Sequence, residues 1–259
     1  MANTPPHAVE RLRAELKASS TRPFVARGAR LRRCADCMLA ERACICAWRP
    51  ALQARAGICL IMHPLEPLKP TNTGRLIADC LADTHAFVWS RTETDPALLE
   101  LLADDQWQPY IVFPGEYAEP DRQVVTALPA DGRRPLLIIL DATWTQARKM
   151  FRKSPWLAGL PMLSLQTEVL SRYRLRRSSR DDHLCTVEVA TACLALAGDA
   201  QAAGLLDDYF EVFTEAYLAS RGNYALPPAS PARERLAAHL ARHETMADSA
   251  TPEALKQLK

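Results

Sequence analysis

The sequence predicts an α/β domain built on a mostly parallel β-sheet with helices on both faces. Two observations support this fold class. Short apolar runs that suit buried strands alternate with helical patterns, and this alternation is typical of crossover units in parallel sheets. In addition, 259 residues, of which 48% are hydrophobic and 24% charged, suffice for one large domain with a sizeable core and exclude disordered and fibrous classes.

The expected strands and helices can be read in order along the chain. The apolar runs expected to be strands are Gly57–Met62, Ala86–Ser90, Tyr110–Phe113, Leu136–Leu140 and Met162–Leu165. The helical patterns are Thr73–Ala82, Pro96–Ala103, Thr145–Lys153, Leu184–Ala197 and Ala203–Ser220. The link between residues 114 and 134 is less regular.

The two ends of the chain are expected to lie outside this domain. Residues 1–20 suit a short amphipathic helix or a loose arm, and the helix-forming but polar sequence from Pro227 onward suits a flexible end. The N-terminus lacks the apolar core of a secretory signal, and no apolar run approaches the ~20 residues that cross a bilayer. A cytoplasmic protein is therefore the simplest interpretation. The net charge of +2 does not discriminate between partners.

Four of the eight cysteines are clustered in a pattern typical of a metal site. Cys34 and Cys37 form a C-x-x-C pair, and Cys44 and Cys46 follow as a second close pair. Two such pairs supply a tetrahedron of thiolates, which indicates one structural Zn²⁺ without an open coordination position. A single iron is the alternative, but nothing in the sequence favours it. Disulfides are not expected between these cysteines in a reducing compartment.

Arginines gather in two clumps. One precedes the cysteines, at Arg22, Arg27, Arg30, Arg32 and Arg33. The other lies within residues 171–180, at Arg172, Arg174, Arg176, Arg177 and Arg180, with Tyr173 among them. A charge run is often only a solvated face. Two clumps beside a predicted crevice favour contacts with an RNA backbone, and Tyr173 could stack on an unpaired base.

Polar, proline and glycine residues follow every predicted strand. In open α/β sheets, ligands bind beyond the carboxyl ends of the strands, so a ligand crevice is expected there. The sequence contains neither G-x-G-x-x-G after the first strand nor G-x-x-x-x-G-K-[ST], which argues against ordinary dinucleotide and P-loop nucleotide binding.

Asp141 is the strongest candidate catalytic residue. It directly follows the apolar run Leu136–Leu140, and partial desolvation there is expected to raise the pKa of its carboxyl group toward that of a useful base. The alternative is that Asp141 only caps the next helix. On that helix, Arg148 and Lys149 suit either phosphate binding or plain solvation, and Trp144 either a ligand contact or core packing. His63 is a weaker candidate base.

Five sequence blocks, in order, resemble those of one family. The blocks are the four-cysteine cluster, HPLEPLKPTNTGRLI at 63–77, FPGE at 113–116, LDATWTQARKM at 140–150, and SRYRLRR with LCTVEVA at 171–190. Together they are similar to the DTW-domain family, named for its Asp-x-Thr-Trp motif. The resemblance extends over roughly residues 30–220. It implies four regions: an N-terminal arm (1–29), a zinc-binding knuckle (30–50), a DTW catalytic domain (51–225) and a C-terminal tail (226–259).

The resemblance also implies an activity. Such proteins are tRNA-uridine aminocarboxypropyltransferases, which transfer the 3-amino-3-carboxypropyl group of S-adenosylmethionine to N3 of a uridine in tRNA and release methylthioadenosine. Asp141 would then be the base for N3 or the anchor of the α-ammonium group. The residues expected to bind S-adenosylmethionine are Pro114, Gly115, Glu116, Thr143, Trp144, Leu184, Thr186 and Glu188. The residues expected to bind RNA are Arg75, Arg172, Tyr173, Arg176 and Arg177.

The resemblance further implies similarity to the SPOUT methyltransferases, whose sheet carries a C-terminal trefoil knot. Two alternatives therefore stay open at this point. One is a SPOUT-like S-adenosylmethionine-dependent RNA methyltransferase. The other is a zinc-knuckle RNA-binding protein without catalytic activity.

Overall fold

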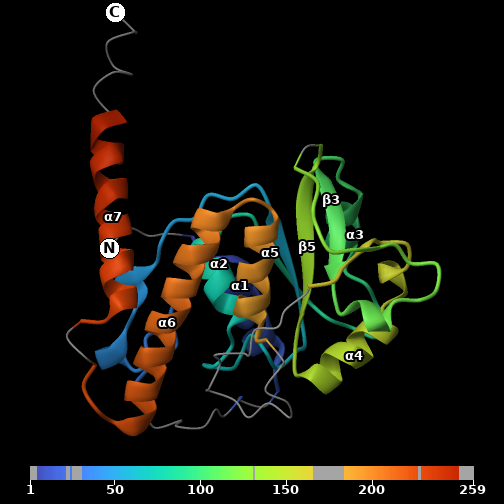
Figure 1. The fold of residues 1–259 in the computed structure, drawn as a ribbon. Coiled ribbons are helices and arrows are strands. Elements are labelled where there is room, and N and C mark those ends of the chain that lie inside the picture. The colour runs from blue at the N-terminus through green and yellow to red at the C-terminus, as the bar shows by residue number, and fades with distance from the viewer. Residues whose placement is uncertain are drawn as a thin grey trace, which may run out of the picture.

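A six-stranded, entirely parallel sheet forms the centre of the fold (Figure 1). The computed structural model describes residues 5–21, 24, 31–130, 132–165, 184–226 and 229–250, without the side chains of 243–250. The strands are β1 (Gly57–Met62), β2 (Thr84–Val88), β3 (Trp107–Val112), β4 (Val124–Val125), β5 (Arg134–Asp141) and β6 (Met162–Leu163). They lie in the order β2-β1-β5-β3-β6-β4.

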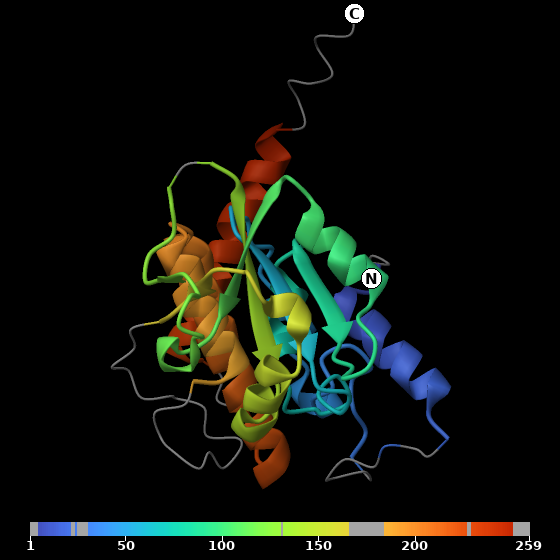
Figure 2. The same cartoon turned by 90° about the vertical axis from the view of Figure 1, so that its right-hand side faces the viewer.

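Helices cover both faces of the sheet, as the sequence predicts (Figures 1 and 2). One face packs against α2 (Gly74–Cys80), α5 (Thr186–Leu196) and α6 (Ala200–Gly222). The other packs against α3 (Pro96–Ala103) and α4 (Trp144–Arg152). The described part of the chain also contains four short 3₁₀ turns: η1 (Glu41–Ala43), η2 (Cys46–Trp48), η3 (Gly115–Tyr117) and η4 (Pro155–Leu157).

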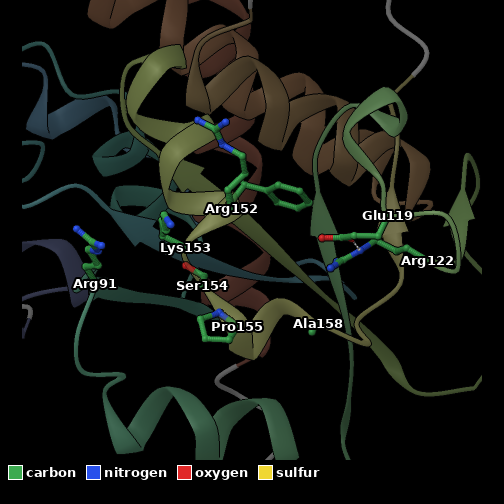
Figure 3. A pocket seen from close by; sticks show the side chains of 9 residues that line it. Arg91, Glu119, Arg122, Arg152, Lys153, Ser154, Pro155 and Ala158 are labelled. Atoms are coloured by element: carbon green, nitrogen blue, oxygen red, sulfur yellow. Dashed lines mark hydrogen bonds and ion pairs between the residues drawn. The ribbon is translucent and has the colours of Figure 1, made fainter.

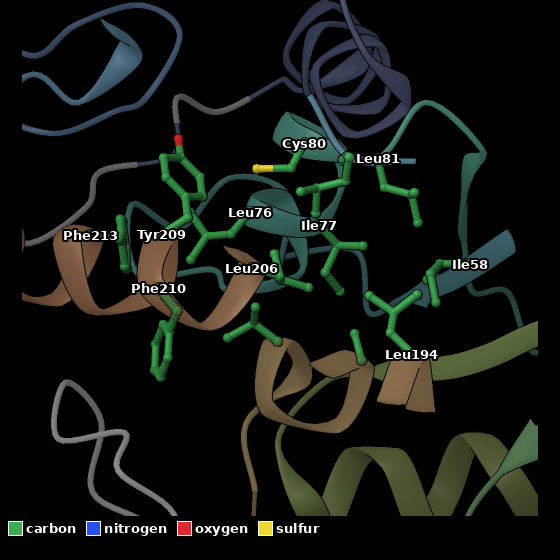
Figure 4. Close-up of a cluster of buried hydrophobic side chains, with 14 of the residues drawn as sticks. Ile58, Leu76, Ile77, Cys80, Leu81, Leu194, Leu206, Tyr209, Phe210 and Phe213 are labelled. Carbon is green, nitrogen blue, oxygen red and sulfur yellow. The ribbon is translucent and has the colours of Figure 1, made fainter. Parts of the chain in front are cut away.

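The alternation of side chains along β5 divides the core into two. Leu137 and Ile139 join the cluster under α2, α5 and α6, whereas Leu136, Ile138 and Leu140 join the cluster under α3 and α4. A strand buried on both faces needs apolar residues at every position, which explains why β5 appears in the sequence as an unbroken apolar run. Figure 4 shows the first cluster, where side chains of α2 and α6 meet.

All five predicted strands and all five predicted helices are confirmed, with shifts of a few residues at their ends. The sequence did not reveal β4, a two-residue strand that pairs with β6 inside the irregular link.

The two terminal segments pack more closely than the sequence suggests. Helix α1 (Ala8–Ser19) lies against β2 and α2, and the side chain of Val9 is buried. The helix-forming sequence after Pro227 does form a helix, α7 (Pro231–Ala250), and this helix packs on α6 through buried Ala232 and Leu236 rather than lying apart from the domain. Because α7 buries only a narrow stripe, many of its residues are polar, as in a segment exposed to solvent on all sides.

The connection from β6 to α5 runs through residues 166–183, which lie outside the described part of the chain. The trefoil knot implied by the resemblance therefore stays an expectation. Among the residues that the structure describes, none of the helices combines the length and apolarity needed to cross a bilayer.

Candidate active site at the carboxyl edge of the sheet

Asp141 is the last residue of β5 and lies at the carboxyl edge of the sheet, beside the end of β1. Only 3% of its surface is exposed. Its Oδ2 accepts a hydrogen bond of 2.6 Å from Asn72 Nδ2, and its Oδ1 accepts one of 2.5 Å from Thr186 Oγ1. The carboxylate therefore connects three segments that are far apart in the sequence: the loop after β1, the end of β5 and the start of α5.

The loop after β1 contains a second buried carboxylate, that of Glu66. Lys69 Nζ donates to Glu66 Oε1 at 2.7 Å, and Asn72 Nδ2 donates to Glu66 Oε2 at 3.3 Å. The Asn72 side chain also accepts a bond of 2.9 Å from the main-chain N–H of Arg75. Asn72 thus contacts both carboxylates and the first turn of α2.

Gly74 gives Asp141 the space that it occupies. A Cβ atom at this position would lie 2.6 Å from Asp141 Oδ2, closer than real Cβ atoms approach. Asn72 and Gly74 are the functional candidates that the sequence analysis did not single out. Both lie in the PTNTGR segment after the first strand. This segment contains several polar residues, and the sequence alone does not indicate which of them lies beside Asp141.

The expected RNA contact of Arg75 is corrected by the structure. Its guanidinium lies in the interior with 1% of the residue exposed, 2.8 Å from Asp79 Oδ2 and over the ring of Phe213. Asp79 also accepts from Tyr209 Oη at 3.0 Å. Arg75 therefore belongs to a buried ion-pair network rather than to a surface that RNA could reach.

Asp141 does not cap helix α4. The N-cap is Thr143, whose main-chain N–H donates to Gln146 Oε1 at 3.1 Å. The other end of the Gln146 amide lies 3.1 Å from His63 Nε2, and burial lowers the pKa of His63. The capping alternative for Asp141 is thereby removed, and His63 lies beside the site as a neutral neighbour of α4.

Trp144 belongs to an aromatic cluster at the start of α4. Its ring stacks on Phe113 with centroids 5.4 Å apart and meets Tyr117 edge-on at 5.8 Å. The chain between these two partners contains the expected cofactor residues Pro114, Gly115 and Glu116. Gly115 N–H donates to Ser164 Oγ at 3.0 Å, which fixes this turn against the end of β6. Trp144 therefore packs on the two aromatic residues that flank the Pro114–Glu116 turn.

The expected cofactor residues of α5 divide into two kinds. Thr186 contacts Asp141, as described above. Glu188 is buried and accepts a bond of 2.8 Å from the main-chain N–H of Cys185, so it closes the first turn of its own helix. Leu184 precedes this turn and is half-buried, whereas Thr143 and Glu116 are exposed.

The four clustered cysteines converge. All four Sγ atoms lie within 4.8 Å of one another, and the pairs Cys34–Cys46 and Cys37–Cys44 are separated by 3.7 and 3.8 Å. A Zn–S bond of about 2.3 Å in a tetrahedron requires S–S separations of about 3.8 Å. The donor set therefore fits one zinc ion. A hydrogen bond from Cys46 lowers the pKa of the Cys37 thiol to about 5, so the cluster already favours one thiolate.

Comparison with known proteins adds the family. The family model for the DTW domain matches residues 31–218. The chain belongs to the DTW-domain family. Curated relatives include proteins named tRNA-uridine aminocarboxypropyltransferase 2 from Macaca fascicularis and Drosophila melanogaster, 27% and 25% identical over 169 and 170 residues. These alignments include 63% and 62% of this chain but 55% and 65% of the two relatives, so the chain spans somewhat more than half of their length. No solved structure is significantly similar.

The DTW domain includes both the cysteine cluster and the surroundings of Asp141 within its matched range. Of the five residues expected to bind RNA, four lie outside the described part of the chain: Arg172, Tyr173, Arg176 and Arg177. In the other arginine clump, exposed Arg32 lies 3.3 Å from Glu41 and Arg33 donates to Met38 O at 2.9 Å. The bond from Arg33 to Met38 links two residues within the knuckle.

Proposed function

We propose that this DTW-domain protein transfers the 3-amino-3-carboxypropyl group of S-adenosylmethionine to N3 of a uridine in tRNA. The observation that carries the proposal is the DTW match over residues 31–218, a range that includes the buried Asp141 and its partners. The names of the curated relatives supply the reaction and the substrate. The chain spans only part of those relatives, so their activity is carried over as a proposal.

The residues at the carboxyl edge suit S-adenosylmethionine, which is a cation at sulfur and carries an ammonium and a carboxylate group. When bound, it supplies an electrophilic γ-carbon next to a sulfonium leaving group. Trp144, with Pro114 and Gly115 beside it, offers an aromatic and backbone surface for the adenosine and the sulfonium. Asp141 offers a negative charge for the ammonium group.

Asp141 has two roles that its geometry allows. A weakly acidic N–H such as that of uridine N3 becomes nucleophilic when its proton leaves, and a fixed carboxylate accepts that proton. Alternatively, Asp141 holds the ammonium group and thereby aims the γ-carbon, rather than the methyl, at N3. A carboxylate has about four acceptor positions, and the bonds from Asn72 and Thr186 hold that of Asp141 in a fixed orientation, which both roles require.

In the balanced reaction, a bond forms between uridine N3 and the γ-carbon while the bond between that carbon and sulfur breaks. The N3 proton passes to the base, and the sulfonium becomes the neutral thioether of methylthioadenosine. A zinc ion held by Cys34, Cys37, Cys44 and Cys46 would have no open coordination position for a substrate, so we assign it no step of this chemistry. We propose that Zn²⁺ holds the knuckle together and that the protein is cytoplasmic.

The test is a reaction of purified protein with unmodified tRNA and S-adenosylmethionine, followed by mass analysis of the nucleosides. The expected product is an aminocarboxypropyl-uridine, with release of methylthioadenosine. A methylated nucleoside with S-adenosylhomocysteine would identify a methyltransferase instead. Binding of tRNA with neither product, and without an increase in the melting temperature on addition of S-adenosylmethionine, would indicate a binding protein without catalysis.

A further inference from the structure

A pocket of about 360 Å³ lies between the C-terminal end of α4, the segment after β2 and the segment after η3 (Figure 3). Its lining contains four cations, Arg91, Arg122, Arg152 and Lys153, and a single carboxylate, Glu119. The sequence analysis identified no role for this group, and the mechanism proposed for Asp141 does not use it.

Arg122 and Glu119 neutralise each other. Arg122 Nε lies 2.6 Å from Glu119 Oε2, and Arg122 Nη1 donates to the main-chain oxygens of Leu157 and Leu160 at 3.0 and 3.2 Å. The Arg122 side chain is only 6% exposed. This ion pair therefore has a structural role, because Arg122 links its own loop to the segment at residues 157–160. The net positive charge of the pocket comes from the other three cations.

Arg91, Arg152 and Lys153 are exposed, and none of them is paired with a carboxylate in the described part of the chain. The only contact of the Arg152 guanidinium there is a bond of 3.4 Å from Nε to Arg148 O. The sequence around the end of α4 adds no negative charge, because residues 142–165 contain four Arg or Lys and no Asp or Glu. Glu93 and Asp95 follow Arg91, but neither forms an ion pair with it among the described residues.

Helix electrostatics explain only part of this arrangement. Cations in the last turn of α4 complement the negative end of its dipole, which accounts for Arg152 and Lys153. Arg91 comes from a different segment, three residues beyond the end of β2, and lines the same pocket. Three exposed cations around one helix terminus repel one another, and an anionic ligand would offset that repulsion.

The floor of the pocket offers no polar group that could select a base or a small molecule. The hydroxyl of Ser154 is buried and already accepts from Trp89 Nε1 at 2.9 Å and donates to Met150 O at 2.8 Å. The remaining uncharged residues of the lining are Phe151, Pro155 and Ala158, whose side chains are apolar. Cations around a floor without available polar groups favour recognition by charge, which is how proteins contact phosphates rather than bases.

We infer that this pocket binds a phosphodiester of the tRNA backbone. The inference rests on the proposed function, because it takes the same RNA as its ligand. Helix α4 joins the two places: it begins three residues after Asp141 and ends at the pocket, with nine residues that span about 13 Å at 1.5 Å each. A polymer can reach both ends of this helix, and Arg148 and Lys149 are exposed between them.

The test compares two double variants that each remove one arginine and one lysine. Arg91→Gln with Lys153→Gln changes the pocket. Lys17→Gln with Arg221→Gln is the control, since both residues are exposed and neither forms an ion pair among the described residues. Affinity for an unmodified tRNA transcript is measured across a range of salt concentrations for the full-length proteins.

The pocket variant is expected to bind roughly tenfold more weakly at low salt, with the slope of log affinity against log salt reduced by about two. The control variant is expected to retain the wild-type slope. Because the contact is to phosphate, different tRNAs should lose affinity equally. Equal changes in the two variants, or an unchanged slope in the pocket variant, would overturn the inference.

Two further measurements separate this inference from the proposed function. Affinity for S-adenosylmethionine should be the same in wild type and pocket variant, and a selective loss of it would assign the pocket to the cofactor carboxylate instead. Absence of product from the wild-type enzyme, with the slope still reduced in the pocket variant, would overturn the proposed function and leave the RNA contact standing.

Discussion

Asn72 donates a hydrogen bond of 2.6 Å to Asp141 Oδ2 while the same amide nitrogen lies 3.3 Å from Glu66 Oε2. One side-chain amide is therefore shared between two buried carboxylates. Since repulsion between like charges is strongest in a buried environment, this shared amide and the Lys69 ammonium on Glu66 both favour the placement of two carboxylates at the carboxyl edge of β1 and β5. Asn72 is thus a positioning residue for Asp141.

Asp141→Asn tests the role of the carboxylate. An Asn side chain can direct its oxygen to Asn72 and its amide to Thr186, whose hydroxyl can accept as well as donate, so the variant should fold. If Asp141 is the base, turnover should fall by roughly 10²–10⁴-fold with little change in affinity for tRNA or S-adenosylmethionine. A higher pH should then partly restore the rate, because more uridine ionises without help.

The same variant distinguishes the other roles. If Asp141 anchors the ammonium group, affinity for S-adenosylmethionine should fall and a higher pH should not restore turnover. The measurements are a pH–rate profile and a cofactor titration. Turnover close to that of the wild type at neutral pH would remove Asp141 from the mechanism.

Gly74→Ala tests the packing of Asp141. The new methyl group would lie 2.6 Å from Asp141 Oδ2, and the two hydrogen bonds to this carboxylate prevent it from moving away freely. We expect a destabilisation of about 1–3 kcal/mol, as for other overpacked interiors, together with a loss of turnover. The free energy of unfolding in urea provides the measurement.

Gly204→Ala is the matched control. Gly204 lies within α6, and a Cβ atom there would meet no other atom within 4 Å. Alanine should therefore stabilise the helix by about 0.5–1 kcal/mol without affecting turnover. If the two variants changed stability in the same direction, the steric argument for Gly74 would be wrong.

The sequence was sufficient to predict the sheet because its central strands β1, β3 and β5 are buried on both faces. Runs such as Leu136–Leu140 have no polar position and can only be central strands of a covered sheet. The two-residue strand β4 escaped prediction because its pairing with β6 depends on main-chain register rather than on side chains. The sequence after Pro227 is recognisably helix-forming, but the packing of α7 on α6 was not predicted, because α7 buries a stripe only a few residues wide.

The site was predictable only in part, for a related reason. The position of Asp141 after an apolar strand is a local signal, and it identified the residue correctly as lying at the carboxyl edge. Its partners Asn72 and Thr186 are 69 and 45 residues away in the sequence. Which polar residue of a loop reaches across the sheet depends on the fold, and the burial of Arg75 shows that the same uncertainty applies to cations.

Cys37→Ser tests the zinc site. Wild-type protein should contain about one equivalent of zinc, and the variant should lose it, because one of four thiolates is replaced by a weak ligand. Loss of zinc should also destabilise the segment around Leu39 and Ile45, both of which are buried in the core. The measurement is metal analysis together with thermal unfolding.

Cys193→Ala is the control for that experiment. Cys193 is fully buried in α5 and belongs to the apolar core rather than to the cysteine cluster. The control should retain its zinc whatever its effect on stability. Full metal content in Cys37→Ser would refute the four-cysteine site.

His7 makes the stability of the protein depend on pH. Its Nε2 lies 3.1 Å from Asp79 Oδ1, and Asp79 has a completely buried side chain. Burial alone would lower the pKa of His7, but hydrogen bonds and charge interactions with Asp79 and Glu10 outweigh it and raise that pKa above 6.5. The charged form is therefore favoured in the folded protein. Its contribution to stability is fully present below about pH 6.5 and is lost as the pH rises through the higher folded pKa.

His7→Asn removes this contribution and keeps an N-cap acceptor for helix α1, where His7 Nδ1 now accepts from the main-chain N–H of Glu10 at 3.3 Å. The variant should be less stable than the wild type at pH 6, and the difference should shrink by pH 9. Asp79 and Glu10 have lowered pKa values and stay ionised at both pH values, so they do not contribute to the change.

His85→Asn provides a contrast with the opposite trend. Burial lowers the pKa of His85, so the neutral form is favoured in the folded protein and the stability contribution of His85 is lost as the pH falls. Urea unfolding of the three proteins at pH 6 and pH 9 measures both trends, and a stability difference for His7→Asn that is the same at the two pH values would show that the imidazole is not charged in the folded protein.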